Sequence, residues 1–508
     1  MNSKELTLTD LIAHAKKIRP STDVALIERA YAFADSAHKG QLRMSGEPYI
    51  IHPLHAAMNL VDMHVPDNVI VAGLLHDVAE DTPVTLEQIK DAFGEDVASM
   101  VNGICKVGKI KYRGMDRYIE NLRKMFLAMA SDVRVIIIKF ADRLHNLETL
   151  ESIPHKKAYR IALESLEIYA PIANRLGMGD VKGKLEDAAF KWVMPKEYEW
   201  ASNLATQSMQ NKQLQIQKVI EQTIEELNIS KIPFDDVHGR QKHIYSLYRK
   251  LLKNNRDISK IYDLLAIRCV MPTIADCYAG LGVIHSKWTP LKGRIKDYIS
   301  QPKPNGYQSL HTTVFYERGA IVEFQFRTVE MHEAAEFGIA AHWTYDEQKA
   351  KRAAAARMKQ ILNDKELEWM DSLHNVQENI KKKEFFDSLE EMKLDVFNDR
   401  IFVYTPKGDV IDLPEDSTPI DFAYSIHTEI GNTCTRAKVN DAIHPLDQPL
   451  KSGDIVEVIT DKNRKGPSPD WLKFAKTRHA RAKIRQYARA SISSWLKDVL
   501  PNPTKKKK

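Results

Sequence analysis

The segment His76 to Thr82, HDVAEDT, constrains this chain more than any other, because it places a metal-ligand pair and a carboxylate pair side by side. An apolar run, VIVAGLL, precedes it directly. On a helix, Glu80 and Asp81 would lie four positions beyond His76 and Asp77, so both pairs would face one way. An imidazole beside a carboxylate suits a borderline divalent cation, and the second pair can hold and deprotonate a metal-bound water.

Two further ligands lie elsewhere in the first 150 residues. His52 belongs to the short apolar segment GEPYIIHP, and Asp142 follows the hydrophobic run Val135 to Ala141. Asn146 falls one helical turn after Asp142 and could steady the same site or a phosphate. An isolated His-Asp pair is usually a surface or capping feature, but so many ionisable groups beside apolar runs favour a functional site. The predicted metal ligands are His52, His76, Asp77 and Asp142.

A second cluster begins at Val237 with VHGRQKHIYSLYRK, which mixes cations with hydroxyl groups. Such spacing along a loop and the first turns of a helix suits a polyphosphate, although a single charge run is more often a solvated helix face. The following segments favour the polyphosphate site. The cations here are Arg240, Lys242, Arg249 and Lys250, and the hydroxyl groups belong to Tyr245, Ser246 and Tyr248.

Two carboxylates are associated with apolar strand-like segments downstream. Asp263 precedes the run Leu264 to Met271, and Glu323 alternates with apolar residues in IVEFQFRT, which predicts a strand with one buried and one polar face. Asp263 and Glu323 could therefore bind Mg²⁺ together with substrate phosphates. Between them, a loop marked by Pro and Gly brings donors and a ring able to stack a base, namely Lys296, Lys303, Tyr307 and His311. No Walker A motif occurs, so a P-loop fold is not expected.

These motifs together resemble the long RelA/SpoT homologues, bacterial enzymes that make and destroy the alarmones ppGpp and pppGpp. The resemblance runs from about residue 20 to about residue 490 and rests on RMSGEPYIIHP, HDVAEDT, ADRLHN, GRQKHIYS, GRIKDYI, PNGYQSLHT, VEFQFRT and AAHW, in the family's order. The HD motif taken alone resembles the HD superfamily of metal-dependent phosphohydrolases.

For the first site, the resemblance implies a guanosine-3′,5′-bis(diphosphate) 3′-pyrophosphohydrolase. The four ligands would bind Mn²⁺, and Glu80 and Asp81 would activate the attacking water. Arg43, Ser45 and Asn146 match family positions that hold the guanine nucleotide. Met44 departs from the family pattern, since many relatives have a Lys there.

For the second site, the resemblance implies a GTP diphosphokinase that transfers pyrophosphate from ATP to the 3′-hydroxyl of GDP or GTP. Asp263 and Glu323 would hold Mg²⁺, and Glu323 would also help to deprotonate that hydroxyl. The ATP-side positions are Arg240, Lys242, Ser246 and Lys250, and the acceptor-side positions are Lys296, Lys303, Asn305, Tyr307 and His311. The RxKD submotif at Arg294 to Asp297 is the version seen in bifunctional members of the family. Because a bifunctional chain would run two opposing reactions, our hypothesis is that the two sites are coupled antagonistically.

The expected fold is multidomain: an all-α HD hydrolase domain, an α/β synthetase domain with a mixed, nucleotidyltransferase-like sheet, and a β-grasp TGS domain. The expected divisions are hydrolase, synthetase, helical connector, TGS domain and the basic start of a helical domain, at residues 1–200, 201–345, 346–392, 393–461 and 462–508. Four scattered cysteines without CxxC spacing suit a reducing cytosol. No signal peptide or membrane-spanning run is evident, so we expect a cytoplasmic protein without a membrane partner.

The last segment differs from the rest in charge. Residues 462–508 hold 15 Lys or Arg against two acids, a surplus of +13, whereas the whole chain is +6 and the remainder therefore −7. Interleaved aromatics favour RNA as partner, and His427 matches a histidine that meets the tRNA acceptor end in ribosome-associated relatives, so the ribosome and uncharged tRNA are expected partners. Two alternatives remain open: a hydrolase-dominated enzyme with a silent synthetase, and a ribosome or tRNA-binding module with vestigial sites.

Overall fold

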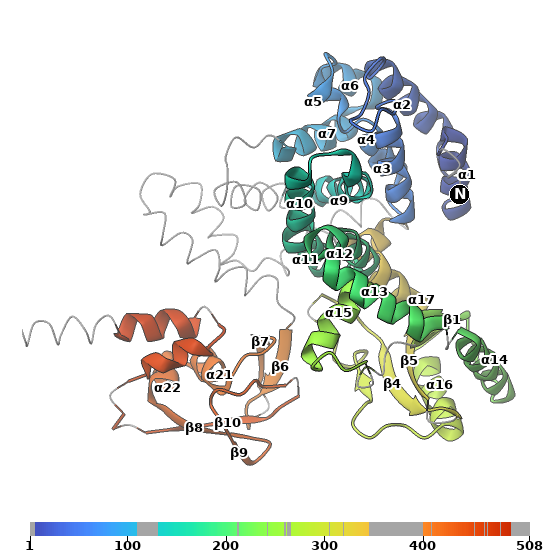
Figure 1. The fold of residues 1–508 in the computed structure, drawn as a ribbon. Coiled ribbons are helices and arrows are strands. Elements are labelled where there is room, and N and C mark those ends of the chain that lie inside the picture. The colour runs from blue at the N-terminus through green and yellow to red at the C-terminus, as the bar shows by residue number, and fades with distance from the viewer. Residues whose placement is uncertain are drawn as a thin grey trace, which may run out of the picture. The chain divides into compact units, whose positions relative to one another are not determined.

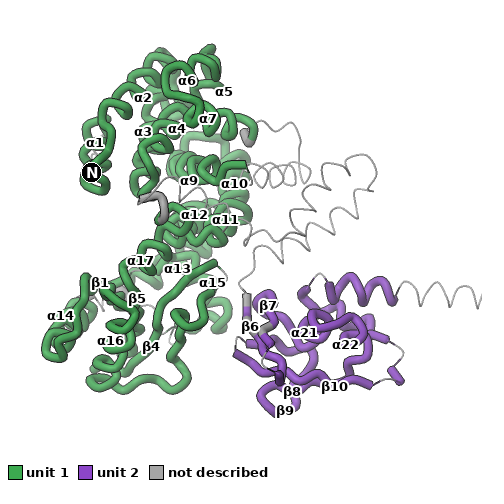
Figure 2. Tube along the Cα trace, turned by 180° about the vertical axis from the view of Figure 1, so that it is seen from behind, with its two compact units in different colours: residues 1–374 green, residues 375–508 purple. Residues whose placement is uncertain are grey.

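The structure, a computed structural model, divides into two compact units, residues 1–374 and 375–508 (Figure 2). It describes residues 6–108, 131–210, 213–240, 242–258, 261, 266–303, 305–317, 320–344, 400–407, 409–451, 453–461, 463–464, 466–477 and 479–488. The helical connector expected at residues 346–392 and the carboxylate Asp263 lie outside the described residues.

The first half of unit 1 is helical, as expected (Figure 1). Its helices are α1 (Leu8–Ile18), α2 (Val24–Ala37), α3 (Ile51–Asp62), α4 (Asp67–Leu74), α5 (Val78–Asp81), α6 (Leu86–Phe93), α7 (Glu95–Gly108), α9 (Val133–Glu148), η1 (Leu150–Ser152), α10 (His155–Glu164), the π-helical turn η2 (Ser165–Tyr169), α11 (Ala170–Arg175), α12 (Gly179–Val193), α13 (Pro195–Gln210) and α14 (Gln213–Ile229). Capping boxes begin α1 at Thr7 and α6 at Thr85, where the threonine side chain accepts from the third helical N–H.

Helix α9 is the centre of this helical domain. It is apolar over most of its circumference and packs against α3, α4, α7 and α12, which explains why its sequence also looks like a strand. The expected continuous helix through HDVAEDT is wrong, because α4 ends at Leu74 and α5 begins only at Val78. His76 and Asp77 therefore lie in a turn between two helices, where the chain changes direction.

The second half of unit 1 is built on a five-stranded mixed sheet in the order β1-β2-β5-β4-β3. Only the β2–β5 pair is parallel. The elements are β1 (Asp236–Arg240), α15 (Ile244–Lys253), β2 (Ala266–Met271), α16 (Ile274–Lys287), β3 (Lys296–Asp297), β4 (Leu310–Phe315), β5 (Ile321–Thr328), α17 (Val329–Glu336) and η6 (Gly338–Thr344).

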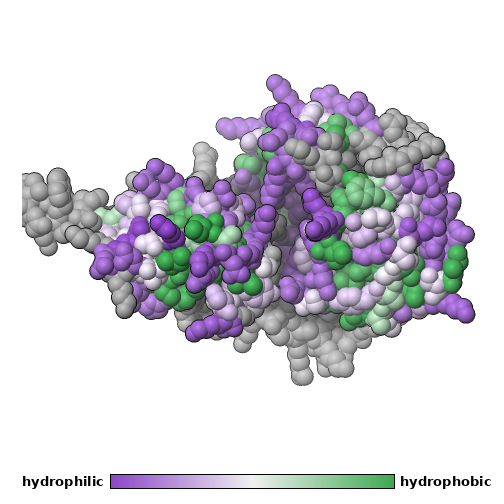
Figure 3. Space-filling model, turned by 90° about the horizontal axis from the view of Figure 1, so that it is seen from below, coloured by the Kyte–Doolittle hydropathy of each residue, from purple (hydrophilic) through white to green (hydrophobic). Residues whose placement is uncertain are grey.

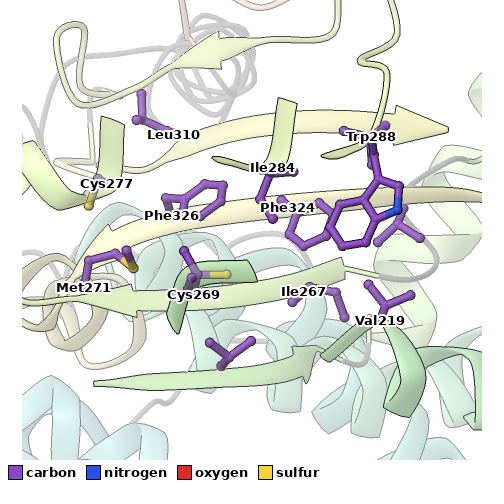
Figure 4. Close-up of a cluster of buried hydrophobic side chains, with 14 of the residues drawn as sticks. Val219, Ile267, Cys269, Met271, Cys277, Ile284, Trp288, Leu310, Phe324 and Phe326 are labelled. Atoms are coloured by element: carbon purple, nitrogen blue, oxygen red, sulfur yellow. The ribbon is translucent and has the colours of Figure 1, made fainter. Parts of the chain in front are cut away.

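The two faces of this sheet carry different residues. One face forms the apolar core with α14 and α16, where Ile267 and Cys269 of β2 meet Phe324 and Phe326 of β5 (Figure 4). The residues between them, such as Arg268 and the polar residues of β5, point to the other face. The expected alternation in β5 is thus confirmed, but its polar side is not open: α17 packs over β2 and β5 there.

Side chains and backbone join the helical domain to the sheet domain. Asp187 on α12 accepts hydrogen bonds from the backbone N–H of Tyr245 and pairs with the His243 ring. Close packing occurs at Gly338, whose φ is +56°, since a Cβ there would lie 2.2 Å from the Leu176 carbonyl oxygen. The two domains meet where a glycine backbone allows direct contact.

Unit 2 contains small antiparallel sheets, the short helices α21 and α22, the turn η7 and a helical stretch at residues 479–488, and the predicted small β domain is confirmed. β6 and β7 form a hairpin, and β10 lies at the edge of a second sheet in the order β10-β8-β9. Described residues beyond 466 pack on the same core: Trp471, Ala475, Ala480 and Ile484 join Tyr424. The elements are β6 (Arg400–Tyr404), β7 (Val410–Pro414), α21 (Pro419–Ile426), α22 (Thr428–Thr433), β8 (Cys434–Val439), β9 (Ala442–His444), β10 (Val456–Thr460) and η7 (Pro469–Lys473).

The face seen from below is mostly hydrophilic, and its hydrophobic residues form separate patches (Figure 3). Among the described residues, no helix is both long enough and apolar enough to cross a membrane.

Candidate active sites

The four metal ligands predicted from the sequence converge in the helical domain, although they come from three separate parts of the chain. His52 Nε2 lies 3.2 Å from Asp142 Oδ1 and 3.5 Å from Asp77 Oδ2. His76 Nε2 lies 3.2 Å from the same Asp77 oxygen and 3.9 Å from the same Asp142 oxygen. Helix α3 supplies His52, the α4–α5 turn supplies His76 and Asp77, and α9 supplies Asp142. Ligands that each bond a central ion at about 2.1 Å stand at such mutual distances.

Hydrogen bonding at the outer nitrogen fixes the orientation of His76. Its Nδ1 lies 2.7 Å from the Gly73 carbonyl oxygen, so Nδ1 carries a proton and Nε2 faces the two carboxylates. That Nε2 is buried and has no hydrogen-bond partner among the described residues. Burial opposes a charge on this ring, but Asp77 and Asp142 outweigh it and raise the pKa of His76 to about 9. The site therefore demands a positive species between imidazole and carboxylate, which a divalent cation supplies.

Asp142 is the most enclosed carboxylate of this group. Lys139, one turn earlier on α9, donates to its Oδ2 at 2.7 Å, and Asn146, one turn later, donates to its Oδ1 at 2.5 Å. Burial alone would favour the protonated acid, but Lys139 and His52 overcome it and hold the pKa of Asp142 well below its ordinary value. Asp142 is therefore an ionised ligand with one oxygen directed to the cation position.

Tyr49 is a site residue that sequence reasoning missed. Its hydroxyl oxygen lies 2.9 Å from Asp77 Oδ2 and 2.8 Å from Asp81 Oδ2, so it links a metal ligand to one of the two predicted water-activating carboxylates. Asp81 and Glu80 are both exposed on the one-turn helix α5, beside the ligands. The signal was present, since Tyr49 lies three residues before His52 in GEPYIIHP.

Arg43 and Asn146, predicted to hold a nucleotide, contact each other. Arg43 Nη2 donates to Asn146 Oδ1 at 2.9 Å, and Arg43 Nη1 lies 3.0 Å from His145 Nδ1. Ser45 is exposed on the same loop, where it donates to Glu47. Arg43 thus lies beside the metal centre, whereas Ser45 is at the tip of the loop and contacts none of the ligands.

The sheet of unit 1 forms a second polar cluster through its register. Successive partners across β3, β4, β5, β2 and β1 are Lys296, His311, Gln325, Arg268 and His238. Because partners in register share a face, this row of polar side chains crosses the whole sheet opposite the apolar core.

Glu323 lies next to that row and is tied to acceptor-side residues. Its Oε1 lies 3.0 Å from His311 Nδ1 and accepts from Gln325 Nε2 at 2.8 Å. The Tyr307 hydroxyl lies 2.9 Å from His311 Nε2, and Lys303 Nζ lies 5.3 Å from the centre of the Tyr307 ring. Burial lowers the pKa of His311, which suits a neutral ring bridging Tyr307 and Glu323. The structure therefore brings together three of the predicted acceptor-side residues around the predicted carboxylate.

The other acceptor-side residues are placed less directly. Lys296 is exposed and is the register partner of His311. Asn305 donates to the Asn174 carbonyl oxygen of the helical domain at 3.3 Å. On the ATP side, Arg240 ends β1, Lys242 precedes α15, and Ser246 and Lys250 lie on α15. With Asp263 outside the described residues, the pairing of Glu323 with Asp263 around Mg²⁺ stays a prediction.

Two buried arginines were not singled out by sequence reasoning. Arg327 is 0% exposed and Arg268 7%, and both pair with one carboxylate oxygen of Glu336, at 2.9 Å and 3.0 Å. Arg268 Nε and two nitrogens of Arg327 have no hydrogen-bond partner among the described residues. Burial, together with the neighbouring arginine, lowers the pKa of Arg268 to about 10. This face therefore carries more positive than negative charge.

His427 in unit 2 is exposed and caps α22, since its Nδ1 accepts from the backbone N–H of Glu429 at 3.2 Å. The other ring nitrogen then carries the proton and is a donor.

Three family descriptions match the chain in succession. An HD domain matches residues 30–179, the region found in RelA / SpoT proteins matches residues 239–350, and a TGS domain matches residues 401–460. The first covers the metal ligands, the second covers the sheet face, and the third covers the small sheets of unit 2.

Curated relatives are similar over nearly the whole chain. A guanosine-3′,5′-bis(diphosphate) 3′-pyrophosphohydrolase of Aquifex aeolicus is 46% identical over 91% of this chain and 64% of its own length. A GTP pyrophosphokinase of Myxococcus xanthus is 44% identical over 92% of this chain and 61% of its own. The bifunctional (p)ppGpp synthase/hydrolase SpoT of Escherichia coli is 42% identical over 92% and 65%. The chain thus spans slightly less than two thirds of each of these relatives.

Proposed function

We propose that this chain, whose successive segments match HD, RelA/SpoT and TGS domains, is a member of the RelA/SpoT family that both makes and hydrolyses (p)ppGpp. The hydrolase would occupy residues 1–200 and the synthetase residues 201–345. The observation that carries the proposal is that two separate constellations coexist: a buried group of His52, His76 and Asp142 with the partly buried Asp77 beside it, and a polar sheet face that holds Glu323.

In the hydrolase, His52, His76, Asp77 and Asp142 would hold a divalent cation, for which Mn²⁺ is our choice since imidazole and carboxylate ligands both suit it. The bound cation would polarise the 3′-pyrophosphate and lower the pKa of a water. Asp81 and Glu80, beside the ligands on α5, would position that water and accept its proton. Arg43 and Asn146 would hold the nucleotide against the centre.

In the synthetase, the sheet face would position the acceptor hydroxyl and neutralise the triphosphate of ATP. Tyr307 would stack the guanine, while Glu323 and Asp263 would hold Mg²⁺ and Glu323 would receive the proton of the 3′-hydroxyl. Lys296, Lys303 and the cations of the ATP side would bind phosphate oxygens. Positioning and charge neutralisation are the main requirements of phosphoryl-type transfer, and a row of fixed donors on a rigid sheet meets them.

For unit 2 we infer binding to the ribosome and to uncharged tRNA. The exposed, donating nitrogen of His427 and the surplus of +13 in residues 462–508 support contact with an RNA end and backbone.

The test is to incubate the purified chain with labelled ATP and GDP plus Mg²⁺, and separately with labelled ppGpp plus Mn²⁺, and to separate the nucleotides by thin-layer chromatography. We expect ppGpp and AMP in the first reaction and GDP with pyrophosphate in the second. Hydrolysis without synthesis, even after ribosomes and uncharged tRNA are added, would contradict a bifunctional enzyme. Neither reaction would contradict the proposal altogether.

A further inference from the structure

His145 lies between the metal ligand His52 and the nucleotide residue Arg43, and no role has been assigned to it so far. It is 3% exposed and belongs to α9, three positions after Asp142. His145 Nδ1 lies 2.7 Å from His52 Nδ1 and 3.0 Å from Arg43 Nη1. On its other side the ring stacks on His55 at 4.4 Å between centres. Three side chains therefore enclose this imidazole.

The chemistry of these neighbours fixes which atoms carry protons. A guanidinium has only donors, so the Nδ1 of His145 must accept from Arg43 and therefore bears a lone pair. Given that lone pair, the short contact to His52 is a hydrogen bond only if His52 Nδ1 is the donor, so the one lone pair is shared by two donors and the shorter contact comes from His52. His52 is then protonated at Nδ1, and its lone pair is at Nε2, the atom that faces Asp77 and Asp142. His145, which is not itself a predicted ligand, thus fixes the tautomer in which His52 can bind a cation.

We propose that His145 is a positioning residue of the metal centre: its Nδ1 accepts the Nδ1–H of His52 and so holds His52 Nε2 in the orientation and tautomer that bind the cation. The other histidine ligand, His76, is oriented in the same way, because its Nδ1–H donates to the Gly73 carbonyl oxygen. The inference rests on the proposed metal-dependent hydrolase and names a residue that it needs. Hydrogen-bond partners of this kind orient the histidine ring and so raise the affinity of the site for the metal ion.

The same contacts tie the nucleotide residue to two ligands. Arg43 reaches His52 through His145, and it reaches Asp142 through Asn146, which accepts from Arg43 and donates to Asp142. The position of Arg43 is therefore coupled to the geometry of the metal centre through single residues on α9.

His145 also belongs to a second group of possible metal ligands, with His55 and Glu148, whose ligand atoms lie within 4.8 Å of one another. With its Nδ1 lone pair engaged and its Nε2 protonated, His145 has no lone pair left for an ion there. The inference thus requires one cation in this region of the helical domain.

The experiment compares His145→Asn with His145→Leu in the full chain. An asparagine Oδ1 stands one bond beyond Cγ, as Nδ1 does, and accepts a hydrogen bond, whereas leucine places a methyl group there. The probe is Mn²⁺ alone, titrated without nucleotide while free Mn²⁺ is followed by electron paramagnetic resonance. The Asp77→Ala chain identifies which binding event belongs to this centre, and His14→Leu is a control on α1, where His14 pairs with Asp62.

We expect His145→Leu to weaken Mn²⁺ binding about 10- to 100-fold, and His145→Asn to stay within about threefold of the unmodified chain. Far-ultraviolet circular dichroism of the same chains reports on folding of the helical domain. Equal loss in both variants, or no loss in either, would overturn the positioning role, and so would two Mn²⁺ ions lost one at a time as His55 and His145 are changed. Failure of the unmodified chain to bind Mn²⁺ would instead contradict the proposed hydrolase.

Discussion

The two candidate sites of unit 1 balance their charges differently. In the helical domain, two carboxylates face two imidazole nitrogens around one point, with Lys139 on the far oxygen of Asp142. On the sheet, Arg268 and Arg327 share the single carboxylate of Glu336. The first arrangement is a nearly complete cage for one cation, whereas the second is a pair of buried cations that share one carboxylate. We propose that the polyphosphate of a substrate supplies further negative charge near them. A metal centre can thus be assembled before its ligand arrives, but a polyphosphate site is completed by its ligand.

The largest expected effect separates the sites completely. Asp77→Ala removes the predicted metal ligand that lies beside both His52 and His76. We expect hydrolysis of ppGpp to fall on the order of a thousandfold, because the metal ion would no longer stabilise the transition state by several kcal/mol. Synthesis of ppGpp by the same chain should be unchanged. Single-turnover rates of both reactions measure this, and a parallel loss of synthesis would break the comparison.

The converse variant is Glu323→Gln. It keeps the shape of the side chain but removes the charge that pairs with His311, and we expect synthesis to fall about 10²- to 10³-fold. Hydrolysis serves as the internal control. Retention of synthesis would mean that Glu323 neither holds the cation nor receives the proton.

Removal of Mn²⁺ from the His/Asp centre should destabilise only the helical domain. Saturation at a hundredfold excess over Kd contributes about 2.7 kcal/mol. For a domain of 150–250 residues this corresponds to a shift of about 5–10 °C in Tm. Calorimetry with Mn²⁺ and with chelator should show that shift in one transition. The Asp77→Ala chain should show none, and a shift that persists there would mean that Mn²⁺ stabilises the protein from elsewhere.

The smallest predicted effect concerns Tyr49. Tyr49→Phe removes the hydroxyl between Asp77 and Asp81 while the ring that stacks on His38 remains. We expect hydrolysis to decrease about tenfold, mainly in kcat, because a partner of a ligand and of the water-activating carboxylate is lost. A change in KM for ppGpp alone, with kcat intact, would mean that Tyr49 acts in binding instead.

Much of the fold and of the hydrolase centre could be predicted from the sequence. The polar alternation of β5 follows from a short-range pattern of apolar and polar residues, whereas the apolar runs of α4 and α9 also fit strands, and the family resemblance favoured helices there. His52, His76, Asp77 and Asp142 were chosen for their chemistry, and the structure brings them within a few ångströms. A divalent cation requires imidazole and carboxylate ligands, and these residue types can be recognised in the sequence without knowledge of the contacts between them.

What the sequence by itself determined is therefore the inventory of chemical groups and the elements that carry them. Only the tertiary structure decided their partners: that HDVAEDT breaks into a turn, that Tyr49 bridges two carboxylates, and that Arg268 joins the polar row. The role of His145 also depends on a contact across 93 residues, to His52. The reason is physical, because the position of a proton on a ring and the register of a strand are set by neighbours that are distant in the chain.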